Sequence, residues 1–223
     1  MNVQTDRALV AAGTPSVRYS IVDVSIPADA ARASDVELIV RDSRGVSTTC
    51  LNELAVDDDL DGLHVRLGDL TRERTVRLVL ATAIEARAEG ASTAIILRVA
   101  DRDHVLFGAP MHVPWRVVDA NTNRAQPVNR TVVIAAAELI ASRAQVEALE
   151  LSRVGAASRA ATRVRKAIAQ IRELLPESRD VNAIANALED TPIGVRLLQE
   201  AEPVGTGSTP HRVMATESPM TAR

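Results

Sequence analysis

Apolar and polar residues alternate with a period of two over the first half of the chain. Between Val3 and about Asn121, short alternating runs are separated by Gly, Pro, Asp and Ser. The clearest runs are Val17/Tyr19/Ile21, Val36/Leu38/Val40, Leu63/Val65/Leu67, Val76/Leu78/Leu80, Ile95/Leu97/Val99 and Met111/Val113/Trp115/Val117. Because successive side chains of a strand point to opposite faces, each run predicts a strand with one buried and one solvated face. Such strands favour antiparallel sheets, and about seven of them at this spacing predict a β-sandwich.

The apolar spacing changes after Pro127 to steps of three and four, which predicts helices. One stripe predicts a helix over 128–154, and a second predicts a helix over 157–175 that stops at Pro176. Pro127 suits the first helical turn, and Gly155 suits the residue that ends the first helix. Two helices joined by so short a connection must run antiparallel, as an α-helical hairpin.

The predicted fold class is therefore mainly β with α: an antiparallel β-sandwich followed by a C-terminal α-helical hairpin. The expected boundaries are a sandwich domain over residues 1–124, a helical region over 125–201 and a tail over 202–223. Short helices are also expected from Asp180 to Leu188 and from Pro192 to Gln199. From Glu202 onward Gly, Ser, Thr and Pro dominate without periodicity, which predicts a disordered tail.

Composition narrows the function classes. Hydrophobic residues make up 46% and charged residues 25% of the chain, as in a globular protein. Aromatic residues make up 1%, and the formal charge is −3, so stacking platforms and a basic surface for nucleic acid are not expected. No run approaches the roughly 20 apolar residues that span a bilayer. With no N-terminal secretion pattern and a single cysteine, Cys50, a cytoplasmic location is expected.

An acidic turn is the best candidate for a metal site. Asp57, Asp59 and Asp61 occupy the first, third and fifth positions of a calcium loop of the EF-hand type, with Gly62 at the sixth. The twelfth position, where such a loop has a bidentate Glu, is Gly68. We therefore predict a solvated turn and no metal or other cofactor, with a calcium-stabilised β module as an alternative.

No catalytic constellation is recognisable from spacing. His64, His104, His112 and His211 are far apart, and Cys50 has no Cys or His neighbour at a zinc spacing. The glycines form neither a G-x-G-x-x-G motif nor a phosphate loop. A non-enzyme is expected. A hydrolase that assembles Cys50 or a Ser with a distant His remains an alternative.

Several motifs resemble the regions that flank the von Willebrand factor A (VWA) domain in a group of bacterial proteins. They span most of residues 5–175. They are 5–10 (TDRALV), 17–24 (VRYSIVDV), Ile26-Pro27, 65–70 (VRLGDL), Pro114-Trp115-Arg116, Asn123, Gln126-Pro127, Arg130 and 148–155 (ALELSRVG). The resemblance implies a sandwich scaffold and a C-terminal helical hairpin.

The A domain itself is expected to be absent. Its adhesion site needs a D-x-S-x-S motif, but the segment Asp23-Val24-Ser25-Ile26-Pro27 lacks the second serine and Asp42-Ser43-Arg44-Gly45 has the wrong spacing. The resemblance therefore implies protein assembly without magnesium-dependent adhesion. A partner could be a VWA-domain relative or an AAA-type ATPase.

These observations lead to one main expectation about function. We expect a non-catalytic protein-interaction or scaffold module that binds neither nucleic acid nor the membrane interior. Its docking surface is predicted to be the alanine-lined groove of the hairpin, with the open edges of the sandwich as the alternative.

Overall fold

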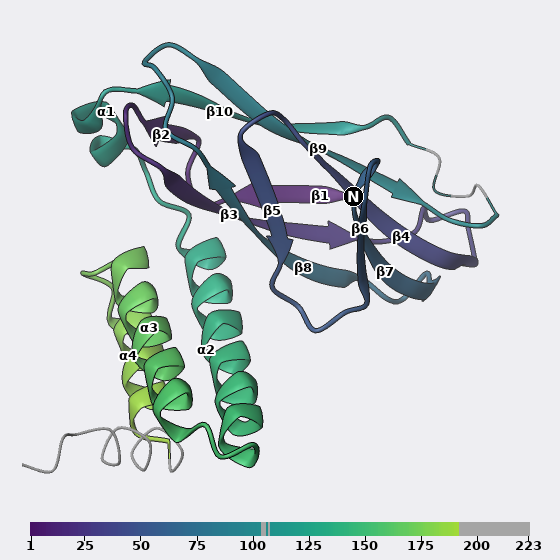
Figure 1. The fold of residues 1–223 in the computed structure, drawn as a ribbon. Helices are drawn as coiled ribbons and strands as arrows, with labels where there is room; N and C mark the ends of the chain where they lie inside the picture. The colour runs from purple at the N-terminus through teal and green to yellow at the C-terminus, as the bar shows by residue number, and fades with distance from the viewer. Residues whose placement is uncertain (104–105, 107, 192–223) are drawn as a thin grey trace, which may run out of the picture.

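The computed structural model describes residues 1–103, 106 and 108–191. Strands form two sheets that face each other, and helices follow them in the chain (Figure 1). The first sheet has the order β1-β3-β8-β5, and the second has the order β2-β10-β9-β4-β7-β6. The strands of the first sheet are β1 (Asn2–Thr5), β3 (Ser16–Val24), β5 (Val46–Cys50) and β8 (Val76–Ile84). Those of the second are β2 (Leu9–Ala11), β4 (Arg32–Asp42), β6 (Val56–Asp59), β7 (Gly62–Thr71), β9 (Ser92–Ala100) and β10 (Met111–Val118).

The mainly β fold class with added helices is confirmed. The six clearest alternating runs lie in β3, β4, β7, β8, β9 and β10. The estimate of about seven strands was too low, because β1, β2, β5 and β6 are short, polar or exposed. The pairing is mostly antiparallel, as expected, and one pair departs from it: β2 runs parallel to β10, with Val10 opposite Val117.

The core between the sheets comes from the inward-facing residues of the alternating strands. Its largest fully buried side chains include Leu38, Leu78, Leu80, Ile95, Leu97 and Trp115. Trp115 is the single tryptophan, and its indole N–H donates to the Arg7 carbonyl oxygen at 3.1 Å. Burial of these side chains supplies the main favourable free energy of folding.

The helices are α1 (Ala120–Ala125), α2 (Arg130–Arg153), α3 (Ala157–Leu174) and α4 (Arg179–Glu189). The predicted hairpin is thus formed by α2 and α3. Gly155 follows α2 with a φ of 76°, as expected for a left-handed residue that ends a helix. Placing Pro127 in the first turn was wrong, because α2 begins at Arg130 after Asn129.

The helix expected from Asp180 to Leu188 is α4, and its N-terminus is capped by the Ser178 hydroxyl, which accepts from the Val181 N–H. The short helix expected over 192–199 and the tail over 202–223 lie outside the described residues.

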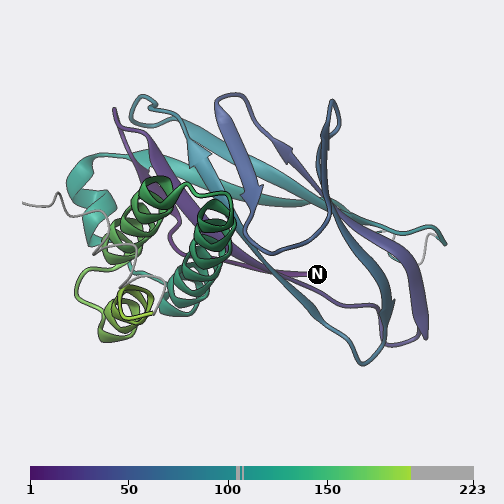
Figure 2. The same ribbon diagram turned by 60° about the horizontal axis from the view of Figure 1, so that its bottom comes forward.

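A second hydrophobic core joins the helices to the outer face of the four-stranded sheet. Helix α4 packs against both α2 and α3, which makes a three-helix bundle. The bundle projects from the sandwich (Figures 1 and 2). Tyr19, Ile21 and Val79 of the sheet are buried in the same cluster as Ile140 and Ile171 of the helices. The two parts therefore share apolar surface that either part alone would expose to water.

Candidate interaction site

The outer face of the four-stranded sheet is covered by the helices over only part of its length. Residues of β3, β8 and β5 form cross-strand rows on this face. The rows, from the covered end to the open end, are Ile21, Val79 and Leu51; then Tyr19, Ala81 and Thr49; then Val17, Ala83 and Ser47. The first row is buried by the helices, whereas all three residues of the last row are exposed. The sheet thus carries an uncovered surface next to the bundle.

Two adjoining hollows occupy this surface, and together they form what we call the sheet–helix groove. The inner hollow has a volume of about 380 Å³ and lies against the helices. The outer hollow has a volume of about 640 Å³ and extends to Pro15 and Glu85. Val17, Ser47 and Ala83 line both. The groove lies where the helices stop short of the open row, in which Ala83 and Ser47 are smaller than Val79 and Leu51 of the covered row.

The inner wall of the groove carries charged and polar side chains from α2 and α3. The Arg163 guanidinium pairs with the Glu147 carboxylate, and its Nη2 lies 3.4 Å from Glu147 Oε1. This hydrogen bond from Arg163 holds the pKa of Glu147 below its ordinary value, against the opposing effect of partial burial. Gln170 donates to the Tyr19 hydroxyl at 3.1 Å, which fixes α3 against the sheet.

Arg143 is the other cation of this wall. Its Nη1 donates to the Cys50 carbonyl oxygen at 3.1 Å, so α2 is fastened to the end of β5. Within the described ranges, no carboxylate forms an ion pair with Arg143. Among the described residues, the Arg143 guanidinium thus has no carboxylate in direct contact, and Glu147 acts on it only from a longer distance.

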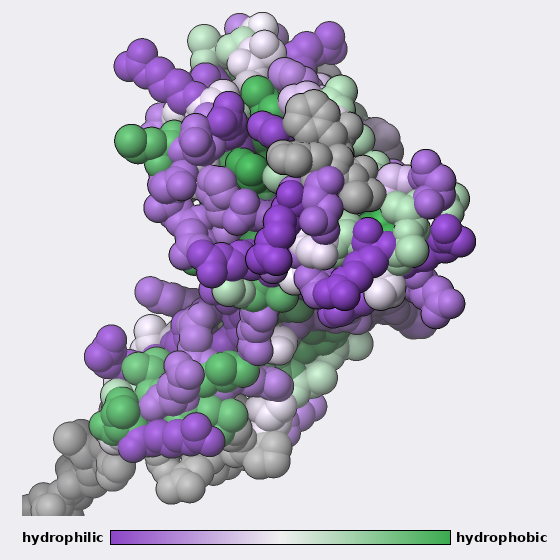
Figure 3. Space-filling model, turned by 90° about the vertical axis from the view of Figure 1, so that its right-hand side faces the viewer, coloured by the Kyte–Doolittle hydropathy of each residue, from purple (hydrophilic) through white to green (hydrophobic). Residues whose placement is uncertain are grey.

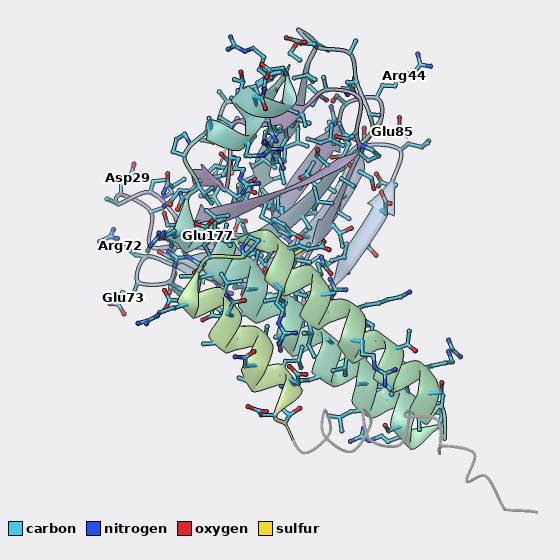
Figure 4. The ribbon with its side chains drawn as sticks, turned by 90° about the vertical axis from the view of Figure 1, so that its left-hand side faces the viewer. Asp29, Arg44, Arg72, Glu73, Glu85 and Glu177 are labelled. Carbon is cyan, nitrogen blue, oxygen red and sulfur yellow. The ribbon has the colours of Figure 1, made fainter. Side chains whose placement is uncertain are left out.

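The labelled charged side chains mark the two ends of the sandwich (Figure 4). Arg44 and Glu85 lie at the end where the outer hollow opens, and Asp29, Arg72 and Glu73 lie at the opposite end. Glu177, between α3 and α4, lies at the end of the bundle that meets the sandwich. The groove thus runs along the strands from the bundle to one end of the sandwich.

Apolar surface is also visible on the bundle (Figure 3). The exposed large apolar side chains of the helical part include Val146 and Leu149 of α2 and Val154 after its last turn. They lie outside the lining of the groove.

The predicted acidic residues lie in β6 and the tight turn that follows it, and each has a basic side chain as a neighbour. Asp57 pairs with Arg66, Asp59 Oδ1 lies 3.3 Å from His64 Nε2, and Asp61 Oδ1 lies 3.0 Å from Arg41 Nη2. Among the residues that the structure describes, no three His, Cys, Asp or Glu side chains are grouped to hold a metal ion. The three carboxylates thus each face a different basic side chain, on β7 or β4, and do not converge on one point.

Cys50, the possible nucleophile, has no described histidine as a hydrogen-bond partner. Cys50 is buried, and its thiol faces Asn52 Oδ1 at 3.9 Å. Burial raises the pKa of this thiol, opposite to the shift that activates a nucleophile. His64 lies between Glu37 and Asp59, His112 is exposed on β10, and His104 and His211 lie outside the described residues.

The alanine-lined groove predicted on the hairpin is not open. Ala136, Ala144, Ala148, Ala160 and Ala167 are all fully buried. Helix α4 and the sheet occupy the space beside these alanines, so their small size serves close helix packing. On the outer side of α3, Arg159 and Arg165 are exposed. Arg172 of the same helix pairs with Glu189 of α4.

The open sheet edges are also partly closed by side chains. The Asp42 carboxylate accepts from the Thr48 N–H at 2.8 Å and thereby occupies the outer edge of β5. The Gln126 side-chain oxygen likewise accepts from the Leu9 N–H, at the outer edge of β2, at 2.8 Å. Such capping removes the unpaired backbone groups that a partner strand would use.

Several residues of the motifs described above meet at the junction between the sandwich and the bundle. Arg18 donates to the Leu9 carbonyl oxygen at 2.7 Å and to Asn123 Oδ1 at 3.0 Å. Asp6 accepts from the Tyr19 N–H at 3.1 Å, and burial raises the pKa of its carboxyl. These contacts support a structural role for the motif residues, as a network that fixes the start of the helices.

The groove residues Ser47, Ala83, Arg143 and Gln170 were not singled out by the sequence patterns. One signal was present: Arg143 and Glu147 interrupt an apolar helix at a spacing of four, which puts both on one flank. The sequence pattern could not reveal the floor of the groove. Small residues on a strand leave a hollow only where no helix covers them, and the pattern does not show where the helices end on the sheet.

Comparison with known proteins gives remote structural neighbours. A von Willebrand factor type A protein from Catenulispora acidiphila is 12% identical with a TM-score of 0.39, covering 70% of this chain and 38% of that protein. The ArnB paralog VWA2 from Sulfolobus acidocaldarius is 10% identical with a TM-score of 0.38, covering 77% and 44%. The sixth cohesin of scaffoldin B from Acetivibrio cellulolyticus is 13% identical with a TM-score of 0.29, covering 52% and 93%.

This chain thus spans less than half the length of the two VWA proteins. At these TM-scores the likeness assigns neither family nor function. No protein-family model matches the sequence. No curated protein matches it either. Separately, the described helices include none with the length and hydrophobicity to cross a membrane.

Proposed function

We propose that this chain is a non-catalytic protein-interaction module that takes a segment of a partner protein in its sheet–helix groove. The observation that carries the proposal is the uncovered row of Val17, Ala83 and Ser47 beside the bundle. Interaction sites are commonly hollows where apolar surface lies next to a few polar groups that fix orientation. The groove combines a small-residue floor with the charged wall of α2 and α3.

The chemistry of the described side chains supports a binding role more than catalysis. Cys50 is buried with a raised pKa, and the acidic turn is internally paired. An active site needs a nucleophile or base within hydrogen-bond reach of its partner. The sequence motifs add the proposal that the protein acts in an assembly without its own A domain. We also propose the cytoplasm as its location. A VWA-domain relative or an AAA-type ATPase is the corresponding partner class.

The proposal is tested by filling the groove. Ala83→Tyr places a ring on the open row, and Ala183→Tyr is the matched control at an exposed position of α4. Proteins captured by the wild-type chain are identified, purified and titrated against all three chains by calorimetry. A partner that binds wild type and Ala183→Tyr but not Ala83→Tyr supports the proposal. Equal affinity for all three chains contradicts it.

A further inference from the structure

The charge of the inner wall restricts what the groove can bind. Glu147 pairs with Arg163 and also lies within electrostatic reach of Arg143, so the three side chains together keep a net positive charge for a ligand, with Arg143 free of direct carboxylate contact among the described residues. A guanidinium has five N–H donors, and Arg143 spends one of its own on Cys50. A carboxylate that approached Arg143 would gain charge-assisted hydrogen bonds, whereas an ammonium group would be repelled. Charge complementarity therefore favours an acidic side chain at this end.

The floor restricts the shape of the ligand. On β3, Tyr19 and Val17 are two residues apart and point to the same face of the sheet. On β5, Thr49 and Ser47 are arranged in the same way. Side chains two positions apart along a strand repeat every 6.8 Å or so, and an extended peptide has the same repeat. A peptide that lies along the strands can therefore place alternate side chains on successive rows. Small side chains such as Ala83 let its backbone come close to the sheet.

We propose that the groove binds an extended peptide segment that carries an Asp or Glu opposite Arg143 and small or β-branched side chains at alternate positions beyond it. This inference rests on the proposed function and specifies its ligand. The acidic side chain sits between α2 and the end of β5, and the alternate side chains contact Val17, Ala83 and Ser47. Arg143 orients the segment, and the floor sets the size of the side chains it accepts.

The test begins with a random-sequence peptide library displayed on phage and selected on the immobilised full-length chain. The expected consensus is one acidic residue followed by small or β-branched residues at alternate positions. Synthetic consensus peptides are then titrated against wild type, Ala83→Tyr, Arg143→Gln and Arg143→Lys. Ala83→Tyr should abolish binding. Arg143→Gln should weaken binding roughly tenfold to hundredfold, and Arg143→Lys should restore part of the affinity.

Changing the acidic residue of the peptide to its amide should reproduce the Arg143→Gln loss, and this arm needs no altered protein. If Ala83→Tyr abolishes peptide binding but neither Arg143 nor a peptide carboxylate contributes to it, the acidic specificity proposed here is wrong. The groove would still be the binding site. A consensus with a helical spacing of three and four would overturn the extended conformation. Peptides insensitive to Ala83→Tyr, or no selected peptide at all, would contradict peptide binding in the groove. The proposed function is judged separately, by the purified partner.

Discussion

The side-chain amide of Gln126 pairs with both backbone groups of Leu9. Its Oε1 accepts from the Leu9 N–H at 2.8 Å, and its Nε2 donates to the Leu9 carbonyl oxygen at 3.2 Å. Gln126 thus takes the place of a neighbouring strand at the outer edge of β2. Because Gln126 lies in the connection to α2, the same contact fixes the position from which the bundle starts and, through the bundle, the inner wall of the groove.

Replacing Gln126 should therefore destabilise the whole fold. Gln126→Ala leaves the part-buried Leu9 N–H without its partner, which should lower the free energy of unfolding by about 1–3 kcal/mol. Chemical denaturation followed by circular dichroism measures the change. The matched control is Gln145→Ala, which removes the same amide from a partly exposed position of α2 and should change that free energy by less than about 0.5 kcal/mol. Equal effects would show that the Gln126 contact contributes nothing.

His64 should make stability depend on pH. The hydrogen bond with Glu37 is the largest cause of its raised pKa, and Asp59 and Asp61 add to it. The carboxylates that act on it are Glu37 on β4, Asp59 on β6 and Asp61 in the turn, and Asp57 lies opposite it in the pairing of β6 with β7. Asp61 and Asp57 are themselves paired with Arg41 and Arg66. Because the pKa of His64 in the folded state lies above the ordinary 6.5, protonated His64 contributes its full stabilisation below pH 6.5. That contribution is lost as pH rises through the folded-state value.

The measurement compares wild type with His64→Gln across this range. The stability difference between them should shrink as pH rises above 6.5, and Glu37→Gln should remove most of the pH dependence. A difference that grows with pH would have the wrong sign for a histidine held by carboxylates.

The shared core of helices and sheet gives a third prediction. Ile168 is 6% exposed on α3, so Ile168→Asp buries an unpaired carboxylate and should cost about 3–5 kcal/mol. Arg165→Asp, exposed on the same helix, should be mild. Arg163 is not a neutral control, because it pairs with Glu147. Thermal unfolding of the two variants tests the assignment, which is wrong if both melt at the wild-type temperature.

The ion pairs of the acidic turn predict that calcium leaves stability unchanged. Binding of calcium to the folded state would raise the melting temperature by mass action. Asp57, Asp59 and Asp61 already face Arg66, His64 and Arg41, so millimolar calcium should cause no shift. A rise that Asp57→Ala removes would instead support a calcium-stabilised module.

The sequence predicted those parts of the fold that repeat along the chain. Long alternating runs such as Val36/Leu38/Val40 are buried on one face in the structure, as expected. The strand of β5 was missed, because in VSTTC polar residues face both the core and the groove. The three-residue strand β2 is too short to show a period, so its parallel pairing was also missed.

The candidate site depended on contacts that sequence patterns do not contain. Gln126 and Leu9 are 117 residues apart, and Arg143 and Cys50 are 93 apart. The alanine stripe of the hairpin was predicted to line an open docking groove, and the pattern could not show that α4 and the sheet cover it. The groove arises from where the helices stop on the sheet, which is a property of the assembled fold.

The sheet–helix groove is proposed to receive a segment of another protein. Site-specific photo-cross-linking tests this contact, with a benzophenone amino acid placed at Glu85, at the outer rim of the groove, in one chain and at Ala183 in another. Irradiation in a lysate of the source organism is followed by mass spectrometry of the cross-linked peptides. We predict one reproducible adduct from position 85, mapped to an acidic segment of a single partner, and none of it from position 183. The same partner cross-linked from position 183 but not from position 85 would contradict the groove as the interaction site.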